Sequence, residues 1–122
     1  MINYFKYHEF DSPLQEGSGQ LMQPSFLYML NQARHYAGIP FEITSGFRIE
    51  ADIERLEKAG YKVSKNSSHL KGYAADIACE SGLERLKIVQ SLLEAGFTRI
   101  GIAKTFIHCD NDPDKPDSIW TY

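Results

Sequence analysis

At residues 68–77 the chain reads Ser-His-Leu-Lys-Gly-Tyr-Ala-Ala-Asp-Ile, a polar loop that runs into an apolar segment. Asp76 lies inside this segment, between Ala75 and Ile77, where we expect a buried strand. A buried carboxylate is unfavourable unless it is paired, hydrogen-bonded or bound to a metal. The small apolar neighbours argue against a half-exposed strand with a solvated acid. The sequence therefore predicts that Asp76 has a specific partner.

His69 lies shortly before Asp76, in a loop rich in Ser and Asn. Imidazole and carboxylate groups are both zinc ligands, and Gly72 between them allows the backbone to turn sharply. A lone histidine in such a loop is usually solvated, as we also expect for Lys71, and the pair can arise by chance. The pair indicates a metal site only if the chain supplies a third ligand.

A third ligand is available in residues 106–110, which read Phe-Ile-His-Cys-Asp. Side chains alternate along a strand, so the Ile and Cys of this segment are expected to face the core. His108 and Asp110 would then lie together on the other face, which could line a cleft or be an exposed surface. With His69 and Asp76, His108 makes three protein ligands, the number that catalytic zinc combines with an open water position.

The remaining pattern mixes helical and extended segments without the regular alternation of a parallel sheet. It predicts an α+β fold in which helices flank a small antiparallel sheet. The chain length suits one domain over residues 1–122. Helices are expected at 24–37, 50–59 and 82–95, and strands at 41–44, 61–63, 73–79, 99–103, 105–110 and 118–122.

The composition argues against several classes of function. The formal net charge of −3 and the lack of a basic stripe argue against nucleic-acid binding. No apolar run approaches the roughly 20 residues of a membrane span, and residues 1–10 lack the apolar core of a secretory signal. The protein is therefore expected to be cytoplasmic as synthesised, and to act as a monomer. Cys79 and Cys109 are expected to be buried thiols.

Several motifs, in register along the chain, resemble one family. Residues 67–76 follow the pattern SxHxxGxAxD, and a further histidine comes later. This pattern resembles that of the M15 peptidases, which are zinc D-Ala-D-Ala carboxypeptidases and L-alanyl-D-glutamate endopeptidases and share their fold with the hedgehog signalling domain. The short phage and prophage branch is the most similar. The resemblance runs over 10–19, 43–48, 66–69, 96–102, 106–110 and Trp120.

The resemblance implies one zinc ion held by His69, Asp76 and His108. It implies an α+β, hedgehog-like fold and a peptidase that acts on the stem peptides of bacterial peptidoglycan. Whether such an enzyme cuts as an endopeptidase or a carboxypeptidase stays open. A phage-encoded enzyme of this kind would reach the cell wall on lysis or from the particle.

The same resemblance implies roles for three more residues. Arg48 is expected near the metal, where a guanidinium can bind a substrate oxygen or carboxylate and stabilise an oxyanion. Ser68 is expected either to offer its hydroxyl to the substrate or to hold its loop by a local hydrogen bond. Trp120 is expected to be either a core aromatic residue or one wall of the substrate cleft.

The chain departs from the family at the general base. The better-known members carry a Glu three residues before the last histidine ligand, where this chain has Thr105, and others carry a His where it has Phe106. Asp110 is the best candidate base because strand alternation places it beside His108. Asp110 could instead orient His108 through the second ring nitrogen. The missing Glu leaves a second function open, a zinc-stabilised binding or phage structural module without catalysis.

Overall fold

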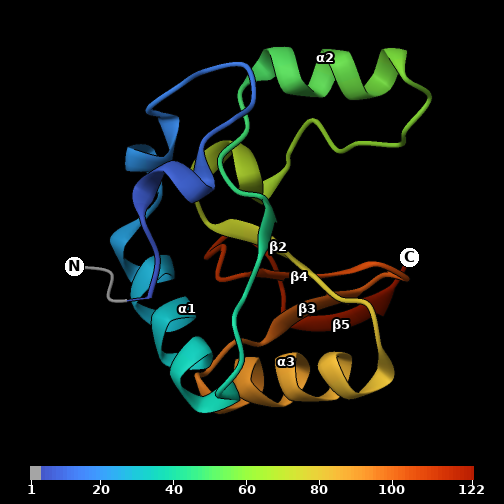
Figure 1. Ribbon diagram of the computed structural model, residues 1–122. Coiled ribbons are helices and arrows are strands. Elements are labelled where there is room, and N and C mark those ends of the chain that lie inside the picture. Colours follow the sequence, from blue (N-terminus) through green and yellow to red (C-terminus); the bar gives the residue numbers. More distant parts are fainter. Residues whose placement is uncertain (1–3) are drawn as a thin grey trace.

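The computed structural model describes residues 4–122, so that residues 1–3 of the predicted domain lie outside the described part. The described chain combines helices with a five-stranded sheet (Figure 1). No helix within residues 4–122 is both long enough and apolar enough to cross a membrane. In chain order, with η for a 3-10 helix, the elements are η1 (Tyr7–Phe10), η2 (Ser18–Leu21), α1 (Pro24–Ala37), β1 (Ile43–Ser45), α2 (Glu50–Lys58), η3 (Ser68–Lys71), β2 (Ala74–Ala78), α3 (Gly82–Glu94), β3 (Arg99–Ile102), β4 (Phe106–Asp110) and β5 (Ser118–Thr121).

The strands are arranged in the order β1-β2-β4-β3-β5. Neighbouring strands are antiparallel except β3 and β5, which are parallel. The loop after β4 carries the chain past β3 to the edge of the sheet, which gives β5 the same direction as β3. The predicted α+β class with helices flanking the sheet is confirmed, and the sheet contains one parallel pair that the sequence did not suggest.

Two expected strands differ from the structure. Residues 61–63 form part of a loop, because no strand within residues 4–122 pairs with them and β propensity alone does not hold a strand. The strand expected at 41–44 begins at Ile43, where pairing with Ile77 of β2 begins. The three predicted α-helices are confirmed to within one residue at each end.

One face of the sheet packs against α1 and α3, which lie side by side (Figure 1). From β4, Ile107 and Cys109 enter this core opposite Ile77 and Ala75 of β2, as side-chain alternation predicts. Both cysteines are buried free thiols, as expected. The helices cover the sheet with Phe26, Leu27, Leu30, Ile88 and Leu92. This apolar face fixes the register of the strands, because a slip of one residue would turn it outward.

The opposite face of the sheet carries a row of residues in cross-strand register. Asp76 on β2 lies between Ser45 on β1 and His108 on β4. Gly101 on β3 follows His108, and Trp120 on β5 ends the row. Because Gly101 has no side chain, the indole of Trp120 lies close over it, with its ring centroid 5.4 Å from that of His108. The fold thus brings a carboxylate, an imidazole and an indole into one line.

Substitution of Gly101 tests this packing. In Gly101→Ala the new Cβ would lie 2.6 Å from Nε1 of Trp120, so the indole must move. We expect a loss of about 1–3 kcal/mol in the free energy of unfolding, as at other over-packed sites. The intrinsic fluorescence should also change, because Trp120 is the single tryptophan of the chain. Gly82→Ala is the matched control, since a Cβ there meets nothing within 4 Å; equal spectra for both variants would contradict the packing.

Candidate metal centre

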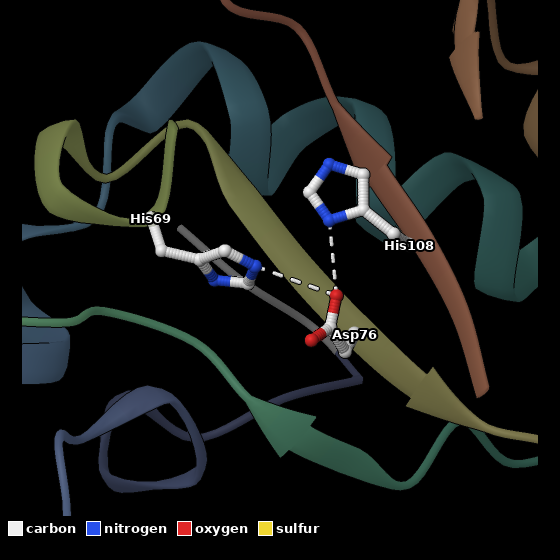
Figure 2. A group of neighbouring side chains, drawn as sticks. All are labelled: His69, Asp76 and His108. Carbon is white, nitrogen blue, oxygen red and sulfur yellow. Dashed lines mark hydrogen bonds and ion pairs between the residues drawn. The ribbon is translucent and has the colours of Figure 1, made fainter. Parts of the chain in front are cut away.

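Three side chains from three separate elements meet on the open face of the sheet. His69 comes from η3, Asp76 from β2 and His108 from β4, and Figure 2 shows them pointing toward one another. Ligand atoms of the three residues all lie within 4.8 Å of one another. The side chains are buried, with 4% of His69, 9% of Asp76 and 9% of His108 exposed. The three residues that the sequence predicts as metal ligands are therefore brought together.

Local backbone features bring His69 and Asp76 together. The hydroxyl of Ser67 accepts a hydrogen bond from the backbone N–H of His69 at 3.2 Å and so caps the short helix η3. Gly72 ends this helix with a φ of 81°, a conformation that disfavours other residues. A Cβ at Gly72 would also lie 2.7 Å from the carbonyl oxygen of Leu21. The chain can therefore turn from η3 directly into β2.

The proton of the His69 ring is fixed by a backbone carbonyl. Nδ1 of His69 lies 2.7 Å from the carbonyl oxygen of Gly46, and since a carbonyl only accepts, Nδ1 must donate. Burial lowers the pKa of His69, although Asp76 partly opposes this shift. The other ring nitrogen, Nε2, faces Oδ1 of Asp76 at 3.4 Å.

Asp110 orients the ring of His108, as the Gly46 carbonyl orients the ring of His69. Nε2 of His108 donates to Oδ2 of Asp110 at 2.7 Å, whereas Nδ1 faces Oδ1 of Asp76 at 3.0 Å. Burial alone would lower the pKa of His108, but the neighbouring carboxylates of Asp110 and Asp76 outweigh burial and raise it. The ring thus lies between two carboxylates, and Asp110 contacts the nitrogen on the side away from Asp76.

Asp76 is the common neighbour of both rings. Its Oδ1 faces His69 and His108, and its Oδ2 accepts a hydrogen bond from the Arg48 guanidinium at 3.3 Å. Burial alone would raise the pKa of this carboxyl, but the two histidines outweigh burial and hold it below its ordinary value. The carboxylate is therefore ionised and is directed at two ring nitrogens.

The donor set fits a divalent metal ion. When both rings donate outward, to Gly46 and Asp110, the lone pairs of two neutral imidazoles and one carboxylate converge, and such lone pairs repel one another unless a cation lies between them. Outward donation of this kind is also how metal-binding histidines are usually oriented. Two imidazoles with one carboxylate match the ligand preference of zinc. The centre can therefore hold a metal ion.

The centre opens into a cleft of about 780 Å³, a volume suited to a small ligand. The remaining residues predicted for the site, namely Arg48, Ser68, Asp110 and Trp120, all contribute to its lining. Trp120 is partly exposed, so it belongs to the cleft wall and not to the core. Sequence reasoning did not single out Arg99, Lys115 and Tyr122, which are among the further lining residues.

Ser68 is held by a residue that the sequence did not single out. Its hydroxyl donates to Oδ2 of Asp112 at 2.8 Å, and the Asp112 side chain is fully buried. Lys71, expected to be solvated, also binds Asp112 at 3.0 Å. Of the two roles predicted for Ser68, these contacts favour the one that holds the loop. Asp112 follows Asp110 by two positions, so alternation could place both side chains on the same face. This spacing is the signal that could have linked Asp112 to the site.

The fold and the centre define a candidate metal-dependent protein with a ligand cleft, and comparisons with known proteins specify the class. A sequence profile for the family described as Peptidase M15 matches residues 3–110. The chain belongs to the M15 peptidase family. The predicted family is thereby confirmed.

A solved structure and a search of curated sequences complete the comparison. The L-Ala D-Glu endopeptidase ChiX of Serratia marcescens is similar in fold, with a TM-score of 0.56 and 22% sequence identity. The similarity covers 62% of this chain and 62% of ChiX, so it spans less than two thirds of that protein. No curated protein sequence matches the chain.

Asp112→Ala tests the network beneath the centre. Hydrogen bonds from the Asp114 backbone, Ser68 and Lys71 hold the pKa of Asp112 below its ordinary value although burial would raise it. We expect the variant to lose about 1–3 kcal/mol in the free energy of unfolding at pH 7. A lowered pKa makes this contribution complete above the ordinary carboxyl pKa, and it is lost as the pH falls through the folded value.

The difference between wild type and Asp112→Ala should therefore shrink from pH 7 to pH 3, as measured by urea unfolding. Asp114→Ala is the control, because that side chain is 77% exposed and should change stability by less than about 0.5 kcal/mol. A difference that stays constant with pH would show that the Asp112 charge does not stabilise the loops.

Proposed function

We propose that this protein is a zinc-dependent peptidase that hydrolyses peptide bonds in the stem peptides of bacterial peptidoglycan. Membership of the M15 family supports a peptidase. The observation that carries the proposal is the convergence of possible ligand atoms of His69, Asp76 and His108 at one buried point beside a cleft. These residues would hold one zinc ion, and we propose that the enzyme acts as a monomer.

A zinc ion held by these residues would act as a Lewis acid and would lower the pKa of a coordinated water to about 7. The protein itself supplies orientation and charge. The carbonyl of Gly46 and the carboxylate of Asp110 fix the two rings, because each accepts a hydrogen bond from the ring N–H that points away from the centre. Arg48 uses one N–H on Ser45 and one on Asp76, at 3.0 and 3.3 Å. A guanidinium has five N–H donors, so Arg48 retains others for a substrate oxygen or a developing oxyanion.

Asp110 has two possible roles, and its hydrogen bonds support the orienting one. Its oxygens accept from Nε2 of His108 and Nε of Arg99, both at 2.7 Å. Asp110 therefore lies across the ring from the nitrogen that faces Asp76, and not on the side where a proton would be taken from water. We propose that Asp110 positions His108 and carries negative charge to its ring.

The cleft and the comparisons support a cell-wall peptide as substrate. A solved structure with a similar fold carries the name L-Ala D-Glu endopeptidase, which favours cleavage within the stem peptide. Trp120 offers an apolar wall beside His108, whereas Arg48 offers a cation, a combination suited to a peptide with carboxylates. Phage origin and release on lysis stay predictions of the sequence resemblance.

A non-catalytic zinc module is the second candidate function. The observation that favours it is the position of Asp110, which leaves the site without an evident general base. The carboxylates that line the cleft, namely Glu9, Asp11, Asp52, Asp76 and Asp110, all accept hydrogen bonds from the protein. Such a module would bind zinc and fold around it but would release no amine from any wall peptide.

Zinc content and hydrolysis together separate the two functions. We expect purified wild type to bind about one zinc ion per chain and to release new amino termini from peptidoglycan fragments, read by mass spectrometry. His69→Ala and His108→Ala should lose most of both, because two ligands do not hold zinc as three do. His35→Ala is the matched control, since this exposed ring contacts Tyr4 away from the centre. Full zinc content in either ligand variant would remove the assignment, and zinc without hydrolysis would select the non-catalytic module.

Asp110→Asn separates the two roles of that residue. An orienting residue should weaken zinc affinity by about 10- to 100-fold when it is replaced. A general base should instead lower kcat by about 100- to 10,000-fold and leave zinc affinity unchanged. We expect the first result, measured by competition with a zinc chelator and by steady-state kinetics at saturating zinc. Unaltered zinc affinity with a large loss of kcat would restore Asp110 as the base.

A further inference from the structure

Lys115 places an ammonium group beside the centre from a loop that the function has not yet used. Its Nζ donates to the hydroxyl of Ser68 at 3.0 Å and to the carbonyl oxygen of Asn66 at 2.7 Å. Ser68 directly precedes the candidate ligand His69. The Lys115 side chain lines the cleft and is 21% exposed. A cation is therefore held at the wall of the cleft, where it binds the residue that precedes the candidate ligand.

The charge of Lys115 is only partly balanced. Its two hydrogen-bond partners, a hydroxyl and a carbonyl, are neutral. The nearest carboxylate, that of Asp112, lies 3.8 Å away and already binds Lys71 at 3.0 and 3.3 Å. Arg48 and Arg99, the other partly covered cations of the lining, each bind a carboxylate within hydrogen-bond distance. The positive charge of Lys115 is therefore less neutralised by nearby carboxylates than the charges of Arg48 and Arg99 are.

The ammonium is also held in place before any ligand arrives. Arg99 donates from Nη1 to the carbonyl oxygen of Pro116 and from Nε to Asp110, which ties down the loop that carries Lys115. An ammonium has three N–H donors, and Ser68 and Asn66 take two of them. The third N–H can bind a ligand at a small further cost in side-chain entropy.

We propose that Lys115 binds a carboxylate of the substrate and makes the protein selective for acidic peptides over their amides. This inference rests on the proposed function, because it names a further group that recognises the same peptide. Ser68 then acts as a positioning residue: its hydroxyl donates a hydrogen bond to Asp112 and accepts one from Lys115. A peptide of the form L-Ala-γ-D-Glu-L-Lys offers two carboxylates, the α-carboxyl group of D-Glu and the carboxyl group at the C-terminus.

Three synthetic peptides test this selectivity on the zinc-loaded protein. They are L-Ala-γ-D-Glu-L-Lys, the same peptide amidated at the D-Glu α-carboxyl, and the same peptide amidated at its C-terminus. For wild type we expect kcat/KM to fall by about 10- to 100-fold for one of the amides, as for loss of a hydrogen bond to a charged group. The affected amide identifies the carboxylate that Lys115 binds. Equal values for all three peptides would overturn the proposal without any variant.

Substitutions assign the selectivity to Lys115. In Lys115→Gln, kcat/KM for the peptide with both carboxylates should fall by about as much as amidation lowers it in wild type. For the affected amide, kcat/KM in Lys115→Gln should stay within about 3-fold of its wild-type value. Lys115→Arg keeps the charge and should retain most of the selectivity. Lys62→Gln is the matched control, because Lys62 lines the same cleft with an exposed side chain. Equal losses for all peptides in Lys115→Gln, or unchanged selectivity, would reduce Lys115 to a structural contact between loops.

A second readout keeps this inference separate from the proposed function. If wild type hydrolyses none of the peptides, the proposed function fails, and titration calorimetry of the same three peptides still compares their Kd values. We expect the same preference for one carboxylate in wild type and Lys62→Gln, and its loss in Lys115→Gln. Identical Kd values for acid and amides in wild type would overturn the carboxylate site in that case too.

Discussion

A carboxylate buried against two imidazoles is the constraint around which this protein is arranged. Asp76 lies in the middle of the sheet with both oxygens committed, one to Arg48 and the other facing His69 and His108. An ionised carboxylate in such a position is costly unless positive charge lies close to it. Arg48 supplies part of that charge. The rings supply more only when they share a proton or a metal ion with Asp76, so the centre is built to attract a cation.

The same strands serve the core and the site because their side chains alternate. On β4, Ile107 and Cys109 pack beneath the sheet while His108 and Asp110 lie above it. Apolar packing against α1 and α3 fixes the register, and that register places His108 directly opposite Asp76. Apolar burial on one face of the sheet thus fixes the positions of Asp76 and His108 on the other face. Only His69, and the Gly46 carbonyl that binds its ring, come from segments outside the strands.

Much of this arrangement could be predicted from sequence because it depends on local patterns. The spacing of apolar residues predicted the helices. The alternation of side chains in the strand 106–110 predicted which residues face the core and which face the site. An acid within an apolar run marked Asp76 as a partnered residue. The parallel pairing of β5 could not be predicted, because it depends on where a loop carries the chain and not on the residues of the strand.

The contacts around the centre were also beyond sequence reasoning. Ser68 meets Asp112 and Lys115 across more than 40 residues of chain. Nothing in the local sequence indicates which residue accepts the hydrogen bond of the Ser68 hydroxyl. The side of the His108 ring on which Asp110 lies depends in the same way on side-chain orientation, because alternation gives only the shared face. Such contacts decide chemical roles, which is why the cluster of His69, Asp76 and His108 was easier to predict than the roles of the residues around it.

X-ray absorption at the zinc edge tests the central claim most directly, because it reports the ligands of the ion itself. For the zinc-loaded protein the account predicts about four nitrogen or oxygen neighbours near 2.0–2.1 Å, with the multiple-scattering signature of two imidazoles. The buried thiols of Cys79 and Cys109 should contribute nothing. Scattering from sulfur near 2.3 Å, or from fewer than two imidazoles, would show that the ion binds elsewhere and would contradict the account.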